Sequence, residues 1–462
     1  MDAKQKKISV LMFPWLAYGH ISPFLELAKK LSKRNFHIFF CSTPINLNTI
    51  KPKLSPKYSQ SIEFVDFHLQ SLPDLPPHYH TTNGLPPHLM NTLKKAFDMS
   101  SLHFSKILKT LNPDLLIYDF ILPWAPLLAL SNKIPAVHFL CTSATVSSFL
   151  VHALKKPCEE EFPFPKIYYC FLNAKFNNKM ENCSGDDGIS DIDRTLQSFE
   201  RSMKIILVKT FEELEGKFMD YLSVLLNKKI VPTGPLIQDP NEDEGDDDER
   251  TKIFLEWLNK KGKSSTVFVS FGSEYFLDKE EREEIAYGLE LSKVNFIWVI
   301  RFPIGENKTN LDEALPQGFL QRVGERGLVV ENWAPQAKIL QHSSIGGFVS
   351  HCGWSSVMES LKFGVPIIAI PMHLDQPLNA RLVVDVGVGL EVRRNHGSLE
   401  REEIAKLIKE VVLGNGNDGE IVRRKAREMS NHIKKKGEKD MDELVEELML
   451  ICKMKPNSCH LS

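Results

Sequence analysis

Short apolar runs and amphipathic segments alternate along the first half of the chain. The run ISVLMF over 8–13 predicts a strand, and the segment 20–35 that follows has helical spacing, with apolar residues on one face. Strands that alternate with helices in this way indicate a parallel sheet that helices cover on both faces. The other strands expected in this half lie over 36–43, 62–67, 113–120 and 135–143.

The alternation breaks at 231–252 and then restarts. This stretch contains Pro and Gly and then an acidic run from Glu242 to Glu249, which is typical of a solvated linker. We therefore predict two doubly wound α/β domains that face each other across a cleft, where ligands bind beyond the carboxyl ends of the strands. The elements expected after the linker are strands over 266–272, 295–301, 327–332, 345–351 and 365–370, a helix over 278–293 and an amphipathic tail helix over 439–454.

Composition and charge exclude several classes of function. At 462 residues the chain is too long for one hydrophobic core, and 42% hydrophobic with 25% charged residues is typical of a globular protein. The net charge of −2 gives no electrostatic reason to expect nucleic acid or an anionic membrane as a partner. The N-terminal residues lack a signal-peptide pattern, and no run approaches the about 18–20 apolar residues of an integral membrane segment. The eight Cys include no C-x-x-C pair, so neither a disulfide framework nor a zinc site is indicated and a cytoplasmic location is expected.

Two titratable residues of the first half are candidates for catalysis. His20 stands at the start of the first predicted helix, where the helix dipole keeps an imidazole neutral, as a general base requires. Asp119 follows an apolar strand, where an unpaired acid would be costly, and a carboxylate that accepts from an imidazole stabilises the imidazolium. His20 could instead only cap or pack, and Asp119 could cap the next turn. Because no G-x-S-x-G motif supplies a serine nucleophile, a His–Asp pair that activates a substrate hydroxyl is the better functional hypothesis.

The segment from Trp333 to Gln376 concentrates aromatic and hydrogen-bonding groups. Within it, SHCGWSSVMESLKFG is a strand end, a Gly turn and a helix start, and free backbone N–H groups with the hydroxyls of Ser355 and Ser356 can bind phosphate. His351 could donate to the same anion, and Glu359 lies one turn further on, where it could accept from sugar hydroxyls. The alternative is two capping serines and a surface Glu.

The two ends of this segment offer different chemistry. Trp333 presents a flat face that could stack on a base, although a buried Trp is more often part of the core. Asp375 and Gln376 follow a strand and could bind the hydroxyls of a hexose, or Asp375 could be an N-cap.

Other nucleotide and metal chemistries lose support. Neither half has G-x-G-x-x-G after its first strand, and G-x-x-x-x-G-K-[ST] is missing from the chain, which argues against a nicotinamide dinucleotide site and a P-loop. Asp246-x-Asp248 lies in the acidic linker with no apolar strand before it, so we interpret the pair as solvated. No metal and no other cofactor is expected, since a helix dipole, His and Ser can carry the charge of a leaving group.

These residues together are characteristic of a known family. Trp333–Gln376 closely resembles the 44-residue signature box of plant UDP-dependent glycosyltransferases of secondary metabolism, and GHISPFLELAKKL near the start and TVFVSFGSE in the second half extend the resemblance over nearly the whole chain. The resemblance implies a GT-B fold of two Rossmann-like domains. The acceptor-binding domain would comprise 1–236 with the C-terminal helix 437–462 packed back onto it, and the UDP-sugar-binding domain would comprise 237–436.

The resemblance also implies a role for each matching residue. His20 would deprotonate the acceptor hydroxyl, with Asp119 as its partner. The remaining residues would contact the donor: uracil and ribose at Trp333, Ala334, Gln336 and Glu359, the diphosphate at Ser273, His351 and Ser356, and the sugar at Trp354, Asp375 and Gln376. Gly353 also belongs to the expected donor-binding residues.

One position departs from the family pattern. The box usually reads HCGWNS, and here it reads HCGWSS, so the shorter Ser355 stands where Asn is common and the contact to phosphate or sugar at this position is open. The backbone N–H groups there could still bind phosphate. With the stretches around His20 and Ser273, this variant resembles the family branch that lengthens sugar chains on existing glycosides.

The leading hypothesis is an inverting transferase, monomeric and without a nucleic-acid partner, that moves glucose from UDP-glucose to a sugar hydroxyl of a triterpenoid glycoside of the mogroside type. Transfer to a bare aglycone or to a flavonoid glycoside is the alternative within enzymes. A non-catalytic sugar-nucleotide-binding protein is the alternative outside them, although such a module has no need of both His20 and Asp119. The acceptor would be bound by variable loops, with 73–90 and the stretch after 140 as the expected ones.

Overall fold

A computed structural model of the chain describes residues 7–156, 160–168, 190–240, 249–273, 275–302, 311–414 and 416–454. The chain divides into two compact units. Unit 1 is drawn from Met1–Pro163, Phe171–Gln238 and Lys436–Ser462, and unit 2 from Phe164–Cys170 and Asp239–Lys435. Most of the acidic run, including Asp246-x-Asp248, lies outside the described residues.

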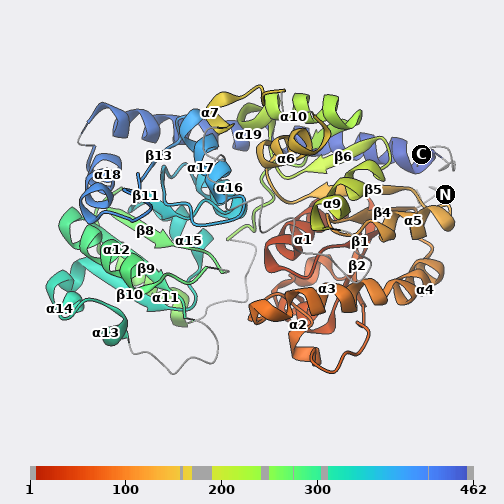
Figure 1. Cartoon of the computed structure of the whole chain (residues 1–462), viewed down its shortest axis with the longest axis horizontal. Helices are drawn as coiled ribbons and strands as arrows, with labels where there is room; N and C mark the ends of the chain where they lie inside the picture. Colours follow the sequence, from red (N-terminus) through yellow and green to blue (C-terminus); the bar gives the residue numbers. More distant parts are fainter. Residues whose placement is uncertain are drawn as a thin grey trace. The chain divides into compact units, whose positions relative to one another are not determined.

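Unit 1 is built on a parallel sheet of seven strands in the order β3-β2-β1-β4-β5-β6-β7. Figure 1 labels β1, β2, β4, β5 and β6 of this sheet. The strands are β1 (Ile8–Phe13), β2 (Phe36–Ser42), β3 (Ile62–Asp66), β4 (Leu115–Tyr118), β5 (Ala136–Leu140), β6 (Ile205–Val208) and β7 (Lys229–Pro232). The α-helices are α1 (Tyr18–Ser32), α2 (Pro44–Ile50), α3 (Met90–Met99), α4 (Ser101–Leu111), α5 (Trp124–Ser131), α6 (Ala144–Lys155), α9 (Asp191–Glu200) and α10 (Glu212–Leu226). Short 3₁₀ turns follow α2 at Lys51–Lys53 and Pro56–Tyr58 and precede α3 at Pro77–Tyr79 and Pro87–Leu89.

Unit 2 repeats the design with six parallel strands in the order β10-β9-β8-β11-β12-β13. The strands are β8 (Thr266–Ser270), β9 (Asn295–Ile300), β10 (Gly327–Glu331), β11 (Ile345–Ser350), β12 (Ile367–Ala369) and β13 (Gly389–Glu391). The helices are α7 (Pro165–Tyr168), α11 (Glu249–Asn259), α12 (Lys279–Ser292), α13 (Leu311–Ala314), α14 (Phe319–Val323), α15 (Gln336–Gln341), α16 (Trp354–Phe363), α17 (Gln376–Asp385) and α18 (Arg401–Leu413), with a 3₁₀ turn at Gly324–Arg326.

The alternation of side chains along the strands builds a core on each face of both sheets. In β1, Val10 and Met12 belong to one buried cluster while Leu11 and Phe13 belong to another. The same division separates Val267 and Val269 from Phe268 in β8. Both sheets are thus buried on both faces, as the continuous apolar runs of the sequence predict.

Every strand expected from the sequence is present, and the capping residue Asp278 of α12 forms a full capping box with Glu281. Three strands were not predicted. β6 spans only Ile205–Val208, and β13 has three residues at the sheet edge. β7, at the edge of the first sheet, begins with Lys229 and ends with Pro232. Short edge strands such as β7 and β13 carry little periodic signal, because they bury few side chains and tolerate Pro and charge. β6 lies inside the first sheet and is buried, and a four-residue apolar run of this kind cannot be told from part of a buried helix.

The predicted tail helix over 439–454 is wrong as a separate element. It is the end of α19 (Asn417–Lys453), a continuous helix of 37 residues whose first part belongs to unit 2 and whose last part belongs to unit 1 (Figure 1). The basic stretch 434–439 does not interrupt the helix, since its long side chains extend into solvent and Lys436 pairs with Glu213 of α10.

The last part of α19 completes the core of unit 1. Met441, Leu444, Leu448 and Ile451 are buried with residues of α1 and of the first sheet. Arg34, which follows α1, adds ion pairs of 2.7 Å to Glu438 and to Asp442.

A short segment from the first half of the chain belongs to the other unit. α7 falls in unit 2, although the sequence reasoning placed 1–236 in one domain. The reason is its packing on α17, where Ile167 is buried and Lys166 forms an ion pair of 3.0 Å with Asp385. Among the helices of the described ranges, none is both long and apolar enough to cross a membrane.

The contribution of α19 to unit 1 can be measured with a matched pair of variants. Leu448→Ala removes a side chain that is 0% exposed, and we expect it to lower the free energy of unfolding by about 2–5 kcal/mol. Leu450→Ala, in the same helix but 50% exposed, is the control and should change it by less than about 1 kcal/mol. Thermal or urea unfolding monitored by circular dichroism gives both values; equal losses would contradict the packing of α19 on unit 1.

Candidate active site

His20 and Asp119 come from adjacent parallel strands of unit 1. His20 lies in the first turn of α1, directly after β1, and Asp119 directly follows β4. β1 pairs with β4 so that Phe13 lies opposite Tyr118, which brings the carboxyl ends of the two strands together. The result is a hydrogen bond of 2.8 Å between His20 Nδ1 and Asp119 Oδ2.

The Asp119 carboxylate is fully buried and held by more than the imidazole. Oδ2 also accepts from the backbone N–H of Trp15 at 2.9 Å, and Oδ1 accepts from the N–H of Phe120 at 2.8 Å. The Phe120 ring stacks on the His20 ring at 5.0 Å between centroids. A carboxylate in this position keeps the proton on Nδ1, so that Nε2 of His20 carries the lone pair of a general base.

Sequence reasoning offered capping of the next turn as the alternative role of Asp119; the local bond that the structure has is from the backbone N–H of the next residue, Phe120, to Oδ1. It accounts for one oxygen only. Oδ2 reaches across 99 residues to His20, which a capping role does not require. The structure therefore brings together the pair that the sequence singled out.

Two neighbours of the pair were missed by sequence reasoning, although the strand expected over 135–143 contains both. Cys141 offers its Sγ within 4.8 Å of ligand atoms of His20 and Asp119, a set that could hold a metal ion. Burial, however, raises the pKa of the Cys141 thiol well above its ordinary value, so the sulfur stays protonated. His138 is fully buried beside Tyr118, and burial lowers its pKa to about 4, so it is neutral at physiological pH.

The second group of predicted residues surrounds the start of α16 in unit 2. His351, Cys352 and Gly353 connect β11 to α16, and Gly353 is an N-cap without a side-chain capping bond. The first turn contains no acidic side chain, so the positive end of the helix dipole is not neutralised from within α16. Ser356 is buried and Ser355 half-buried in this turn.

His351 is wedged between two glycines. A Cβ atom on either Gly272 or Gly353 would lie 2.5 Å from His351 Nε2. Gly272 also has a φ of +75°, a backbone conformation that residues with a side chain rarely adopt. β8 and β11 pair with Ser270 opposite Ser350, so the turn with Gly272 and Ser273 lies beside the turn with His351. Burial, with a smaller contribution from His373, lowers the pKa of His351 to about 4, which leaves a neutral imidazole at pH 7.

Gln336 and Glu359, the predicted ribose ligands, are in direct contact. Gln336 starts α15, and its Nε2 donates to Glu359 Oε2 at 2.8 Å and to Ser356 Oγ at 3.1 Å. Trp333 is 50% exposed, so it is not the core residue that was its alternative role, and Ala334 beside it is half-buried. An exposed indole next to a polar pair is a suitable platform for a nucleoside.

At the far end of the box, Asp375 occupies the N-cap position of α17 but its side chain makes no capping bond. Its Oδ2 accepts instead from Nδ2 of Asn379 at 2.9 Å. Gln376 is 5% exposed, and its Oε1 accepts from the backbone N–H groups of Met372 and His373, both at 3.1 Å. The indole of Trp354 is 4% exposed.

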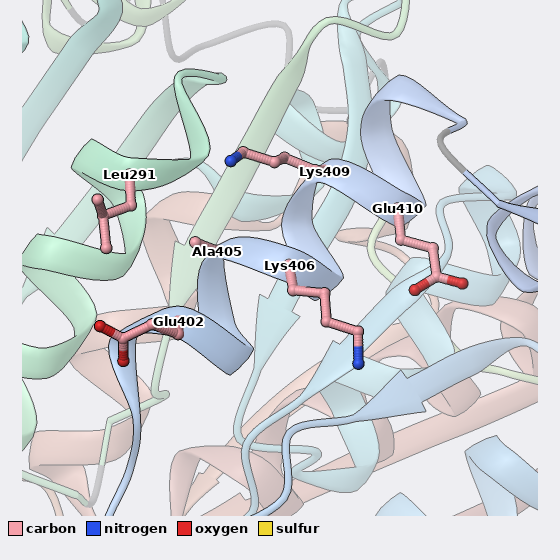
Figure 2. Close-up of a pocket in the computed structure, with 6 residues that line it drawn as sticks. All are labelled: Leu291, Glu402, Ala405, Lys406, Lys409 and Glu410. Carbon is pink, nitrogen blue, oxygen red and sulfur yellow. The ribbon is translucent and has the colours of Figure 1, made fainter.

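The structure thus forms each predicted cluster within its own unit. His20 and Asp119 belong to unit 1, and the residues from Ser273 to Gln376 belong to unit 2. A groove of about 540 Å³ between α12 and α18 is a separate feature, lined by none of these residues (Figure 2). It is lined by Leu291, Glu402, Ala405, Lys406, Lys409 and Glu410, whose charged groups point in different directions.

Comparison with known proteins gives matches along nearly the whole chain. Residues 6–238 match the N-terminal domain family of glycosyltransferases, and residues 204–428 match the family of UDP-glucuronosyl and UDP-glucosyl transferases. A mogroside IIIx synthase of Siraitia grosvenorii is 56% identical over 98% of this chain and 96% of its own length. A beta-D-glucosyl crocetin beta-1,6-glucosyltransferase of Gardenia jasminoides is 50% identical over 94% of this chain and 97% of its own length.

Solved structures agree with the sequence matches. A UGT transferase from Siraitia grosvenorii, crystallised in complex with UDP, matches with a TM-score of 0.74 and 25% identity over 96% of this chain and 100% of that one. Together with the two parallel sheets, this match confirms the GT-B class that the resemblance implied.

The packing of His351 against Gly353 gives a testable expectation. Gly353→Ala would place a methyl group 2.5 Å from His351 Nε2, so the ring or the turn must move, and we expect UDP affinity to fall by about tenfold or more. Gly437→Ala in α19 is the control, because nothing lies within 4 Å of its added Cβ, and it should bind UDP as the parent does. Isothermal titration calorimetry measures both; unchanged affinity in Gly353→Ala would contradict a diphosphate site at this turn.

Proposed function

Since this chain belongs to the family of UDP-glucuronosyl and UDP-glucosyl transferases, we propose that it transfers glucose from UDP-glucose to a sugar hydroxyl of a triterpenoid glycoside. The observation that carries the proposal is the hydrogen bond between the partly exposed His20 and the buried Asp119 in a chain 56% identical to a mogroside IIIx synthase. A non-catalytic binding protein would have no use for this pair. The relative that acts on glucosyl crocetin supports an acceptor that already carries a sugar.

In the proposed reaction, His20 Nε2 takes the proton of the acceptor hydroxyl as its oxygen attacks the anomeric carbon of glucose. The bond from that carbon to the diphosphate oxygen breaks on the opposite side, UDP leaves with the electron pair, and the configuration inverts. Asp119 stabilises the imidazolium and holds the tautomer through the 2.8 Å bond to Nδ1.

Groups of unit 2 would stabilise the negative charge that develops on the leaving UDP. The N-terminus of α16 offers free backbone N–H groups, and His351, Ser273 and Ser356 add neutral donors. Trp333 and Ala334 would hold the uracil, the Gln336–Glu359 pair the ribose, and Asp375, Gln376 and Trp354 the glucose. The proposal contains no metal and no other cofactor.

Loops of unit 1 would bind the acceptor and place its hydroxyl beside His20. The candidates are the loop 73–90, with its two 3₁₀ turns, and the stretch after 140, which leads into α6. A monomer in the cytoplasm stays a prediction from the sequence. The described Cys41, Cys141, Cys352 and Cys452 are free thiols, which suits a reducing compartment.

Acceptor class is tested with matched substrates. The protein with UDP-glucose should convert a triterpenoid monoglucoside to a diglucoside faster than it glucosylates the bare aglycone or a flavonoid glucoside. Mass spectrometry of the products, with UDP release as a second readout, makes the comparison. A preference for the aglycone or for the flavonoid glucoside would support the corresponding alternative, and binding of UDP-glucose without turnover of any acceptor would support a binding protein.

The role of His20 is tested by separating turnover from donor binding. His20→Ala should lower kcat by about 100-fold or more, because a positioned general base contributes on this scale. Its affinity for UDP should stay close to that of the parent, since His20 lies in unit 1 and the donor ligands lie in unit 2. His432→Ala, at an exposed position of α19, is the control and should retain activity. Activity retained in His20→Ala would overturn its assignment as the base.

A further inference from the structure

Asn379 is a buried polar residue beside the donor ligands of unit 2. It lies in the first turns of α17, three residues after Gln376, and is 0% exposed. A buried amide is costly unless its hydrogen-bonding groups are used. The hydrogen bonds of Asn379 therefore indicate why an amide is buried at this position.

Its side-chain nitrogen donates in two directions. Nδ2 donates to the backbone carbonyl of Cys352 at 3.1 Å and to Oδ2 of Asp375 at 2.9 Å. An amide nitrogen has two hydrogens and no lone pair to accept with, so these two acceptors match its donor capacity. One amide group thus spans two parts of the donor site that are 23 residues apart in the chain.

Both acceptors lie at positions where the local conformation matters for the donor site. Cys352 lies between His351 and the N-cap Gly353, and its φ of +64° is one that residues other than glycine seldom adopt. Its conformation must be held by surrounding contacts. Asp375 is at the N-cap position of α17 without a side-chain capping bond, and its carboxylate accepts from the side chain of Asn379, one turn further along the helix.

We propose that Asn379 is a positioning residue that holds the Asp375 carboxylate in register with the phosphate-binding turn at Cys352, so that the hexose and the diphosphate of one UDP-sugar are bound together. This inference rests on the proposed donor, UDP-glucose. In this proposal Asn379 contacts no reacting atom of the donor. It acts on sugar binding by orienting Asp375.

The first test compares UDP with UDP-glucose, two ligands that share the uridine and the diphosphate while only the second carries the hexose, and neither measurement needs an acceptor. Asn379→Ala should weaken UDP-glucose binding by about tenfold, because a bond to a charged acceptor is lost, and should weaken UDP binding by no more than about threefold. Equal weakening of both ligands would show a general structural role and overturn the proposal, as would unchanged affinity for UDP-glucose. Calorimetry gives both dissociation constants.

The second test places Asn379→Ala in an Asp375→Ala background. If Asn379 acts through Asp375, the double variant should bind UDP-glucose within about threefold of Asp375→Ala alone. Independent, multiplying losses would overturn the proposal. Asn379→Ser, which keeps a short donor, is the second variant if Asn379→Ala does not fold, and it should show the same selective loss to a smaller degree.

A matched control and an internal reference separate the possible failures. Asn46→Ala removes another buried amide, 4% exposed, that donates to Thr43 Oγ1 at 3.0 Å in unit 1. It should affect thermal stability but leave UDP-glucose affinity within about twofold of the parent. If the unmodified protein binds UDP but not UDP-glucose, the proposed donor is wrong; if it binds both and Asn379→Ala loses neither selectively, only the inference about Asn379 fails.

Discussion

Parallel strand pairing is the constraint on which both halves of the candidate site depend. Adjacent parallel strands end at the same edge of a sheet, so the residues that follow them become neighbours whatever their separation in the chain. In unit 1 this places His20, after β1, against Asp119, after β4. In unit 2 it places the glycine turn after β8 against His351, after β11. Strand pairing thus fixes which positions become neighbours, and the residues at those positions determine what each cluster can do.

Both clusters use buried polar groups whose cost is offset by hydrogen bonds. The Asp119 carboxylate accepts three bonds in a site that water does not reach, so its charge is stabilised where it can act on the imidazole. Burial keeps His351 neutral, which leaves the positive end of α16 and neutral donors to face an anion. In unit 1, burial likewise keeps His138 neutral. Asn379 extends the same principle, because its buried amide connects two parts of the donor site.

Helix α19 adds a constraint of a different kind. One continuous helix contributes to both units, and its last apolar residues fill the core beside α1. The last turn of α1 contains Lys29 and Lys30, whose positive charges interact favourably with the helix dipole. In the structure, Lys30 and Arg34 also meet the acidic Glu438, so these residues serve the attachment of α19 as well.

The sequence by itself determined the alternating α/β order, most of the strand positions, the family resemblance and the candidate pair His20 and Asp119, because periodicity and motifs are local signals. Only the tertiary structure decided which groups donate to each oxygen of Asp119 and why Gly272 and Gly353 must lack side chains. It also decided that α7 packs with unit 2 and that Asn379 donates to Asp375. Each of these depends on contacts between distant segments, which leave no periodic trace in the chain. The short edge strands β7 and β13 escaped prediction for a related reason: pairing with a neighbouring strand, rather than their own side chains, makes them strands.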